Sequence, residues 1–236
     1  TNNAFTCVDI SSTISINNKF SGATTAANGD VVFAPRNADC VGIFNPSNNA
    51  FSYVDISSTI SSDYKFLYGA TAANGDVIFA PYIADCVGVF SPTNNAFTCV
   101  DISSTISSDA KFHGATTAAN GLVIFAPRNA DCVGVFNPTN NAFTCVDISS
   151  TTSINNKFSG ATTAANGLVI LAPLNSDCVG VFNPTNNAFT CVDISSTISH
   201  DAKFVGATTA ANGDVVFAPR NADCVGVFSP TNNAFT

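Results

Sequence analysis

The stretch KFHGATTAANGLVIFAPRNADCVGVFNPTNNAFTCVDI, residues 111–148, decides the fold. It contains four strand-like segments separated by three short turn signals. Asn120-Gly121 predicts a tight hairpin of type I′, because this pair tolerates two positive φ angles. The segment from Leu122 to Pro127 is apolar without alternation, which favours a strand covered on both faces. Four antiparallel strands in this length, without helical periodicity, are typical of a propeller blade.

The same unit recurs along the whole chain. The segment TNNAF begins at Thr1, Thr93, Thr139, Thr185 and Thr231, with SNNAF at Ser47. Every step is a multiple of 46 residues, and a fixed period of this size indicates a repeat architecture. The repeats are 1–46, 47–92, 93–138, 139–184 and 185–230, followed by the overhang 231–236. We therefore predict one all-β domain over residues 1–236, a closed five-bladed β-propeller with four antiparallel strands per blade.

The repeat pattern F-x-G-A-T-x-A-x-N-G-x-V-x-F-A-P-x-N-A-D-x-V-x-V-F-x-P-x-x-N-x-F resembles kelch-like and NHL-like propeller repeats over the whole chain. The resemblance implies a blade shape, with the small-residue strand innermost, and no particular chemistry. Repeat two differs in that strand, because Leu67-Tyr68-Gly69 replaces the Ser-Gly-Ala of repeat one. We therefore expect Tyr68 in or beside the central channel.

The net charge and the hydropathy of the chain argue against nucleic acid and membrane as partners. The net charge is −8 with only eight basic residues, whereas phosphate binding needs clustered Lys and Arg. No apolar run reaches the roughly 18 residues of a membrane-spanning helix. We expect neither nucleic acid nor membrane as a partner. The first residue is Thr rather than Met, so we expect a fragment or a processed product, and the compartment is not indicated.

Two Asp positions recur in all five repeats. One set is Asp39, Asp85, Asp131, Asp177 and Asp223, and the other is Asp9, Asp55, Asp101, Asp147 and Asp193. A ring of carboxylates could bind calcium, which takes six to eight oxygen ligands. The favoured alternative is that each Asp caps a turn or pairs with a recurring Lys. We expect no metal and no cofactor.

Nine cysteines occupy strand three and strand four of the repeats. No C-x-x-C spacing supports zinc or redox chemistry. If Asn94 is the left-handed residue of the hairpin, Val87 faces Cys99, and Cys86 points to the opposite side of the sheet. We therefore predict no disulfide within a blade and nine free thiols. A different hairpin register would instead bring Cys86 and Cys99 together.

A catalytic constellation is not visible, since His113 and His200 occur once each at non-equivalent repeat positions. Differences between the repeats fall in two loops, which we expect to lie on one face of the propeller. Such differences indicate either a binding surface or neutral drift at exposed positions. The candidate binding residues there are Arg36, Asp63, Tyr64, Tyr82, Arg128, Leu174, His200 and Arg220. We predict a non-enzymatic scaffold that binds a protein or glycan. A multivalent lectin and a self-assembling structural protein are the alternatives.

The termini offer two candidates for the last strand of the fifth blade. Residues 1–10 carry Val8 and Ile10, whereas residues 231–236 copy only the first part of that strand. Burial of large apolar side chains contributes about 1.5–3 kcal/mol each. We therefore predict that the N-terminal strand closes the ring. The tail would then fray or join a neighbouring molecule, giving a monomer or weak self-association.

Overall fold

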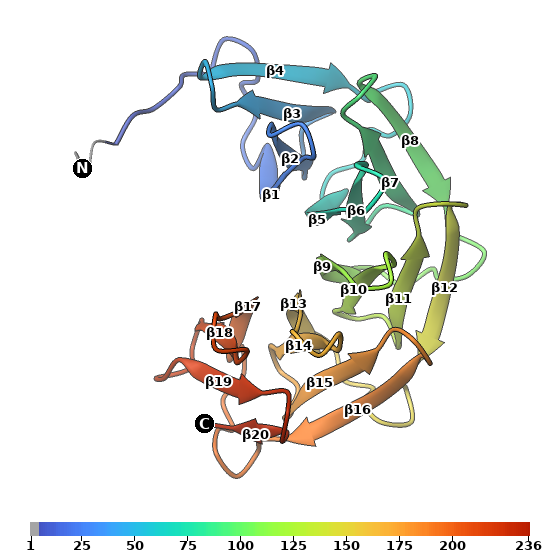
Figure 1. Ribbon diagram of the computed structural model, residues 1–236. Helices are drawn as coiled ribbons and strands as arrows, with labels where there is room; N and C mark the ends of the chain where they lie inside the picture. Colours follow the sequence, from blue (N-terminus) through green and yellow to red (C-terminus); the bar gives the residue numbers. More distant parts are fainter. Residues whose placement is uncertain (1–4) are drawn as a thin grey trace.

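The computed structural model describes residues 5–236 and contains twenty strands in that range. The strands form five separate four-stranded antiparallel sheets, each built from four consecutive strands (Figure 1). The predicted five-bladed β-propeller repeat architecture is confirmed. We number the blades 1 to 5 in chain order.

Each blade runs from an inner strand on the concave side of the arc to an outer strand (Figure 1). Blade 1 contains β1 (Phe20–Thr25), β2 (Val31–Pro35), β3 (Cys40–Asn45) and β4 (Ala50–Asp55). Blade 2 contains β5 (Phe66–Thr71), β6 (Val77–Pro81), β7 (Cys86–Ser91) and β8 (Ala96–Asp101). Blade 3 contains β9 (Phe112–Thr117), β10 (Val123–Pro127), β11 (Cys132–Asn137) and β12 (Ala142–Asp147). Blade 4 contains β13 (Phe158–Thr163), β14 (Val169–Pro173), β15 (Cys178–Asn183) and β16 (Ala188–Asp193). Blade 5 contains β17 (Phe204–Thr209), β18 (Val215–Pro219), β19 (Gly226–Ser229) and β20 (Ala234–Phe235).

The hairpin turns differ in detail from the sequence prediction. At the first hairpin of blade 3 only Gly121 has a positive φ, of 84°, so the predicted type I′ turn is wrong. The last hairpin of blade 2 places its left-handed residue at Asn95 (φ 55°) rather than at Asn94. As a result Ser91 pairs with Ala96, one residue beyond the predicted register.

Neighbouring blades pack an aliphatic face against an aromatic face. Between blades 2 and 3, Ile78 and Val87 meet Phe112 and Phe125 in one buried cluster. Equivalent clusters fill the other three junctions. Burial of these side chains on folding is the main stabilising contribution, at about 1.5–3 kcal/mol for each large one.

The inner strands approach one another most closely, and this explains their small residues. A Cβ added to Gly114 would lie 2.9 Å from the Cα of Gly160, and one added to Gly160 would lie 2.9 Å from the Cα of Gly206. Threonine hydroxyls join the same strands, since Thr117 Oγ1 donates to the Thr71 carbonyl at 2.8 Å. Only glycine permits this backbone approach.

A buried lysine crosses every junction between blades. Lys65 pairs with Asp39 of the preceding blade at 2.8 Å, and its side chain has no exposed surface. The same pair recurs as Lys111–Asp85, Lys157–Asp131 and Lys203–Asp177. Buried amines need such partners because an unpaired charge is costly to desolvate. The predicted pairing of the recurring Lys and Asp residues is therefore observed, between blades rather than within them.

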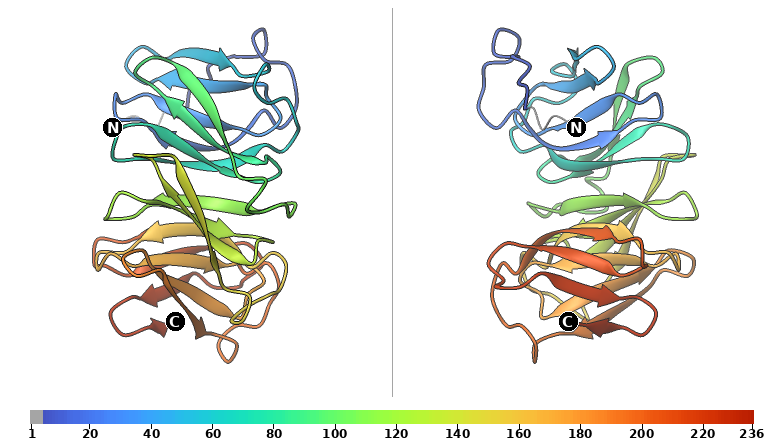
Figure 2. Two further views of the ribbon diagram at one scale, coloured as in Figure 1. Left: turned by 90° about the vertical axis from the view of Figure 1, so that its right-hand side faces the viewer. Right: turned by 60° about the vertical axis from the view of Figure 1, so that its left-hand side comes forward.

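The five blades form an open arc, with blades 1 and 5 at its two ends (Figures 1 and 2). The predicted closure by the N-terminal strand is wrong. The C-terminal copy holds the fourth-strand position of blade 5, where Phe235 pairs with Phe228 and Thr236 exchanges two backbone hydrogen bonds with Val227. A short hairpin links this strand to β19, so its loop-closure cost is small.

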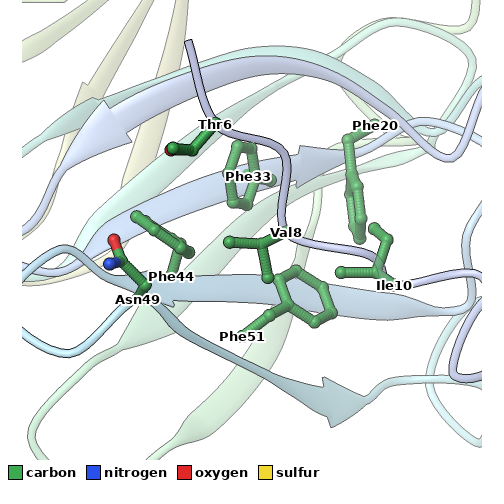
Figure 3. Close-up of a pocket in the computed structure, with 8 residues that line it drawn as sticks. All are labelled: Thr6, Val8, Ile10, Phe20, Phe33, Phe44, Asn49 and Phe51. Atoms are coloured by element: carbon green, nitrogen blue, oxygen red, sulfur yellow. The ribbon is translucent and has the colours of Figure 1, made fainter. Parts of the chain in front are cut away.

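The N-terminal segment lies at the other end of the arc, against blade 1. Residues 5–10 form no strand there. Val8 and Ile10 point toward Phe20, Phe33 and Phe51, and a pocket of about 470 Å³ remains between them (Figure 3). Residues 1–4, which belong to the predicted closing strand, lie outside the described part of the chain.

Candidate functional site

Arginine and tyrosine side chains from successive blades pair on one face of the arc. The Arg36 guanidinium lies 4.4 Å from the centre of the Tyr64 ring. The Arg128 guanidinium lies 5.6 Å from the centre of the Tyr82 ring. Cation–π pairs of this kind contribute about 0.5–1 kcal/mol at exposed sites. These four residues, predicted from the sequence as loop-face candidates, are thus brought together in two pairs.

The backbone holds Tyr64 in an unusual conformation. Its φ of 56° lies in the left-handed region, which costs a non-glycine residue about 1–2 kcal/mol. Asn37 Oδ1 accepts a hydrogen bond from the Tyr64 amide at 3.1 Å and fixes this turn. Arg36 Nε is buried and has no hydrogen-bond partner among the described residues.

His113 lies near the start of β9 and breaks the repeat symmetry of the inner strands. Its Nδ1 donates a hydrogen bond to the Ser159 carbonyl at 2.6 Å. Its ring packs against Tyr68, with 5.2 Å between ring centres. Because a carbonyl only accepts, the proton is on Nδ1, and Nε2 carries a free lone pair.

The surroundings keep this imidazole neutral. Desolvation by burial and, after it, the positive charge of Arg128 lower the pKa of His113 to about 4. Arg220 and Arg36 act in the same direction, while the hydrogen bond to Ser159 opposes them.

We call these residues the inner-rim cluster. It comprises Arg36, Tyr64, Tyr68, Tyr82, His113, Arg128 and Arg220. Sequence reasoning set His113 aside because it occurs once. The signal that could have found it is the one that identified Tyr68, a large side chain in a strand of small residues.

Three of the sequence candidates lie outside this cluster. Leu174 is 2% exposed, so its predicted place on the surface is wrong. It occupies the position of Arg36 in its repeat, and an apolar side chain there turns into the protein. His200 lines a separate pocket with Asp223 and Cys224. Asp63 is exposed beside Tyr64.

Similar pockets open beside all four junctions, lined by loop hydroxyls, aspartates and cysteines. The one beside blade 3 has a volume of about 360 Å³ and contains Asp131 and Asp147. Asp131 pairs with Lys157, and Asp147 accepts a hydrogen bond from the Ser149 amide at 2.8 Å. That bond lowers the pKa of Asp147. Among residues 5–236, no three His, Cys or Asp side chains are grouped to hold a metal ion. Over the same residues, no helix is long and apolar enough to cross a membrane.

The cysteines form disulfides within blades, contrary to the prediction of nine free thiols. The pairs are Cys86–Cys99, Cys132–Cys145 and Cys178–Cys191, each with 5.3 Å between Cα atoms. The one-residue shift in register is the reason. It places Cys99 opposite Gly88, on the same face as Cys86. Among the described cysteines, Cys7, Cys40 and Cys224 are free.

No protein-family model matches the sequence, and no curated protein is similar to it at a significant level. Solved structures do share its fold. Virginiamycin B lyase from Staphylococcus aureus superposes with a TM-score of 0.76 at 15% identity, over 92% of this chain and 69% of the lyase. A streptogramin B lyase gives 0.76 at 19% identity, over 94% and 70%. The WD40 repeats of RRP9 give 0.67 at 9% identity, over 92% and 63%.

These similarities correct the functional expectation. A non-enzymatic scaffold, with a lectin or an assembly protein as alternatives, was expected because no catalytic device repeats. The lyases overturn that expectation, since enzymes are among the structures that share this fold. Repetition was the wrong criterion, because the blades share one central axis. An active site there needs each catalytic side chain only once.

Proposed function

We propose that the chain is a lyase-type enzyme that binds an anionic small molecule at the inner-rim cluster and removes a proton from it with His113. The observation that carries the proposal is the imidazole of His113, which is fixed through Nδ1 and kept neutral by burial and by the positive charge of three arginines. A general base needs a free lone pair held in a defined orientation. Nε2 meets that requirement.

The distribution of positive charge supports an anionic substrate. The chain carries eight basic residues and a net charge of −8. Four lysines are buried in ion pairs between blades. Arg36, Arg128 and Arg220 are therefore most of the cationic groups left to a ligand. Guanidinium groups bind carboxylates and phosphates in a planar, two-point geometry.

In the proposed step, Nε2 takes a proton from the carbon next to the substrate carboxylate. The electron pair of the broken C–H bond forms a carbon–carbon double bond. The leaving group departs with its bonding electrons from the adjacent carbon. The arginines stabilise the negative charge that develops on the carboxylate. The His113 imidazolium then returns its proton to the leaving group, so the step needs no further reactant.

Substrate binding would also make His113 a better base. The three arginines depress its pKa in the free protein. An anion bound to them offsets their charge, so the pKa rises toward the ordinary value near 6.5. The base is therefore activated when substrate is present.

A panel of small carboxylates and phosphate esters tests the proposal, with new conjugated double bonds followed by ultraviolet absorbance. Quinupristin belongs in the panel because a similar lyase was solved with it. We expect turnover of at least one anionic compound by the parent chain. His113→Gln should lower it by about 10²–10⁴-fold, the usual contribution of a general base. His200→Gln, at an exposed histidine outside the cluster, should leave it unchanged. Full activity in His113→Gln would exclude the proposed base.

A further inference from the structure

The two ends of the arc expose faces that are buried everywhere else. On the aliphatic side, Val225 of blade 5 is 54% exposed, whereas its equivalents Val41, Val87, Val133 and Val179 have no exposed surface. On the aromatic side, Phe20 of blade 1 is partly exposed, whereas Phe66, Phe112, Phe158 and Phe204 are fully buried. The end faces are thus the two halves of a junction that is formed four times within the chain.

The N-terminal segment already occupies part of such a junction. Ile10 is the repeat equivalent of Ile56, which packs against Phe66 and Phe79 of the following blade. Ile10 and Val8 likewise point toward the phenylalanines of blade 1 (Figure 3). Residues 5–10 therefore lie where the fourth strand of a preceding blade would lie. The other three strands of that blade are not supplied by blade 5, which holds its own fourth strand.

At the two ends of the arc, one lysine–aspartate pair and one cysteine pair also lack the partner that their repeat equivalents have. Lys19 donates to the Ile16 carbonyl at 2.6 Å, whereas the four equivalent lysines pair with an Asp of the preceding blade. Asp223 has no ion-pair partner among residues 5–236. Cys7 and Cys224 are exposed thiols at the two repeat positions that form disulfides in blades 2, 3 and 4.

The similar lyases are longer than this chain by an amount that matches two blades. The matched 92% of 236 residues is about 217 residues, which is 69% of a chain of about 315. About 98 lyase residues therefore have no counterpart, close to two repeats of 46 residues. We propose that the end faces are docking surfaces for two further blades of this same repeat type. Their addition completes a seven-bladed ring, in which residues 5–10 supply the last fourth strand.

Other occupants fit the gap less well. A second copy seated through the same junction would bring five blades into a gap of two, and its far blades would overlap the first copy. Closure of the present five blades would widen the angle at every junction. Close-packed interfaces resist such a change because each shift opens voids or creates clashes. Two blades leave all four existing junctions as they are.

Free-thiol counting tests this proposal because each arrangement leaves a different number of unpaired cysteines. Thr236 is the repeat equivalent of Thr98, so a copy of residues 99–138 or 99–184 continues the chain in register and ends before a further fourth strand. These additions give six and seven repeats. Thiols are titrated in denaturant without reductant, after oxidation by a small-molecule disulfide that takes up the two electrons of each new bond.

We expect three free thiols for the chain of five repeats, as its structure shows. Six repeats should again give three free thiols. The first added cysteine pairs with Cys224, whereas Cys7, Cys40 and the strand-three cysteine of the new blade stay unpaired. Seven repeats should give one, Cys40, whose partner position is occupied by Tyr53. Cys7→Ser in seven repeats should raise the count to two.

Two results would overturn the proposal. Three free thiols in a folded, monomeric seven-repeat chain would show that the ring does not close at seven. One free thiol in the five-repeat chain would show that Cys7 reaches Cys224 without added blades. Mass measurement under native conditions separates both results from disulfide-linked dimers. A seven-repeat chain that fails to fold while six repeats fold would also contradict the proposal, because the seventh blade should stabilise the ring.

Discussion

His113 links the proposed site to the pH dependence of stability. Its pKa is lowered to about 4 in the folded protein, against 6.5 when unfolded. The unfolded chain therefore binds the proton more readily than the folded one between these values. The stability contributed by the neutral imidazole is complete above pH 6.5 and is lost as the pH falls to about 4.

We expect the free energy of unfolding to fall by up to about 3 kcal/mol between pH 6.5 and pH 4, the energy equivalent of this pKa difference. Urea unfolding across that range measures it. His113→Gln should make the free energy of unfolding less dependent on pH in this window, and His200→Gln should not. The aspartates with lowered pKa values also begin to lose stability near pH 4, but they are present in the parent and in both variants, so the difference between the parent and His113→Gln isolates the histidine. An unchanged curve in His113→Gln would show that the imidazole is not buried as described.

Tyr53 is a second residue at which one repeat departs from the others. It stands opposite Gly42, where the other complete blades place the cysteine that forms the disulfide. Cys40 is therefore left free and buried, and burial raises its pKa to about 11. The half-exposed tyrosine packs little and can be replaced at small cost.

Tyr53→Cys should form a fourth disulfide within a blade, with Cys40. A cross-link closing a loop of this length stabilises a protein by about 3 kcal/mol in the chain-entropy model. We expect a higher melting temperature without reductant and no gain with reductant. Tyr53→Ser is the matched control and should show neither. If Cys40 stays free in Tyr53→Cys, blade 1 does not share the register of blades 2 to 4.

At the scale of the elements, close approach of the inner strands gives the most direct prediction. Gly160→Ala would place a Cβ 2.9 Å from the Cα of Gly206 and force blades 4 and 5 apart. Gly206→Ala meets nothing nearer than 3.9 Å, because no further blade follows. We expect a loss of about 1–3 kcal/mol in unfolding free energy for the first variant, as for other overpacked cores. The second should change it by less than about 0.5 kcal/mol. Equal effects would mean that the inner strands are less crowded than the structure shows.

The strands themselves could be predicted from the sequence, but the register of the last hairpin could not. Asn-Gly, Pro and the apolar runs mark where each strand begins and ends. Both Asn94 and Asn95 tolerate a left-handed conformation, and the sequence does not say which of them adopts it. The structure selects Asn95. That single residue moves every pair in the hairpin by one and turns the predicted free thiols into three disulfides.

At the scale of the whole molecule, the C-terminal copy, and not the N-terminal strand, supplies the fourth strand of blade 5. Phe235 packs against Phe204 and Phe217 at ring-centre distances of 6.1 and 6.4 Å. In the N-terminal segment, Val8 is 41% exposed and Phe5 is 93% exposed. The C-terminal copy is therefore the better-packed strand.

Deletion of residues 231–236 should lower the free energy of unfolding by roughly 1.5–3 kcal/mol, the contribution of one large apolar side chain. Deletion of residues 1–9, which keeps Ile10, should cost less than about 1 kcal/mol because residues 5–9 are exposed. Thermal unfolding of both truncated chains, followed by circular dichroism, gives the comparison. The opposite order would place the N-terminal strand in blade 5.

The number of blades needed for closure could not be predicted from the repeat. Ring curvature follows from the angle between neighbouring blades, which depends on how the Phe-rich and aliphatic faces fit together. The sequence identifies the residues of both faces, but it does not predict the angle between the packed blades. The inner-rim cluster escaped prediction for a related reason. Its residues come from four different repeats and meet only because those repeats share an axis.

The uniform 46-residue spacing of the blades has a consequence for the gene that encodes them. Each repeat corresponds to a whole number of codons, and its copies are nearly identical. Unequal recombination between any two equivalent points therefore adds or removes one complete blade, wherever in the repeat the exchange falls. No reading frame, hairpin or blade junction is broken by such an event. Blade number is thus a trait that mutation can change in single steps, and the width of the opening between the end blades changes with it.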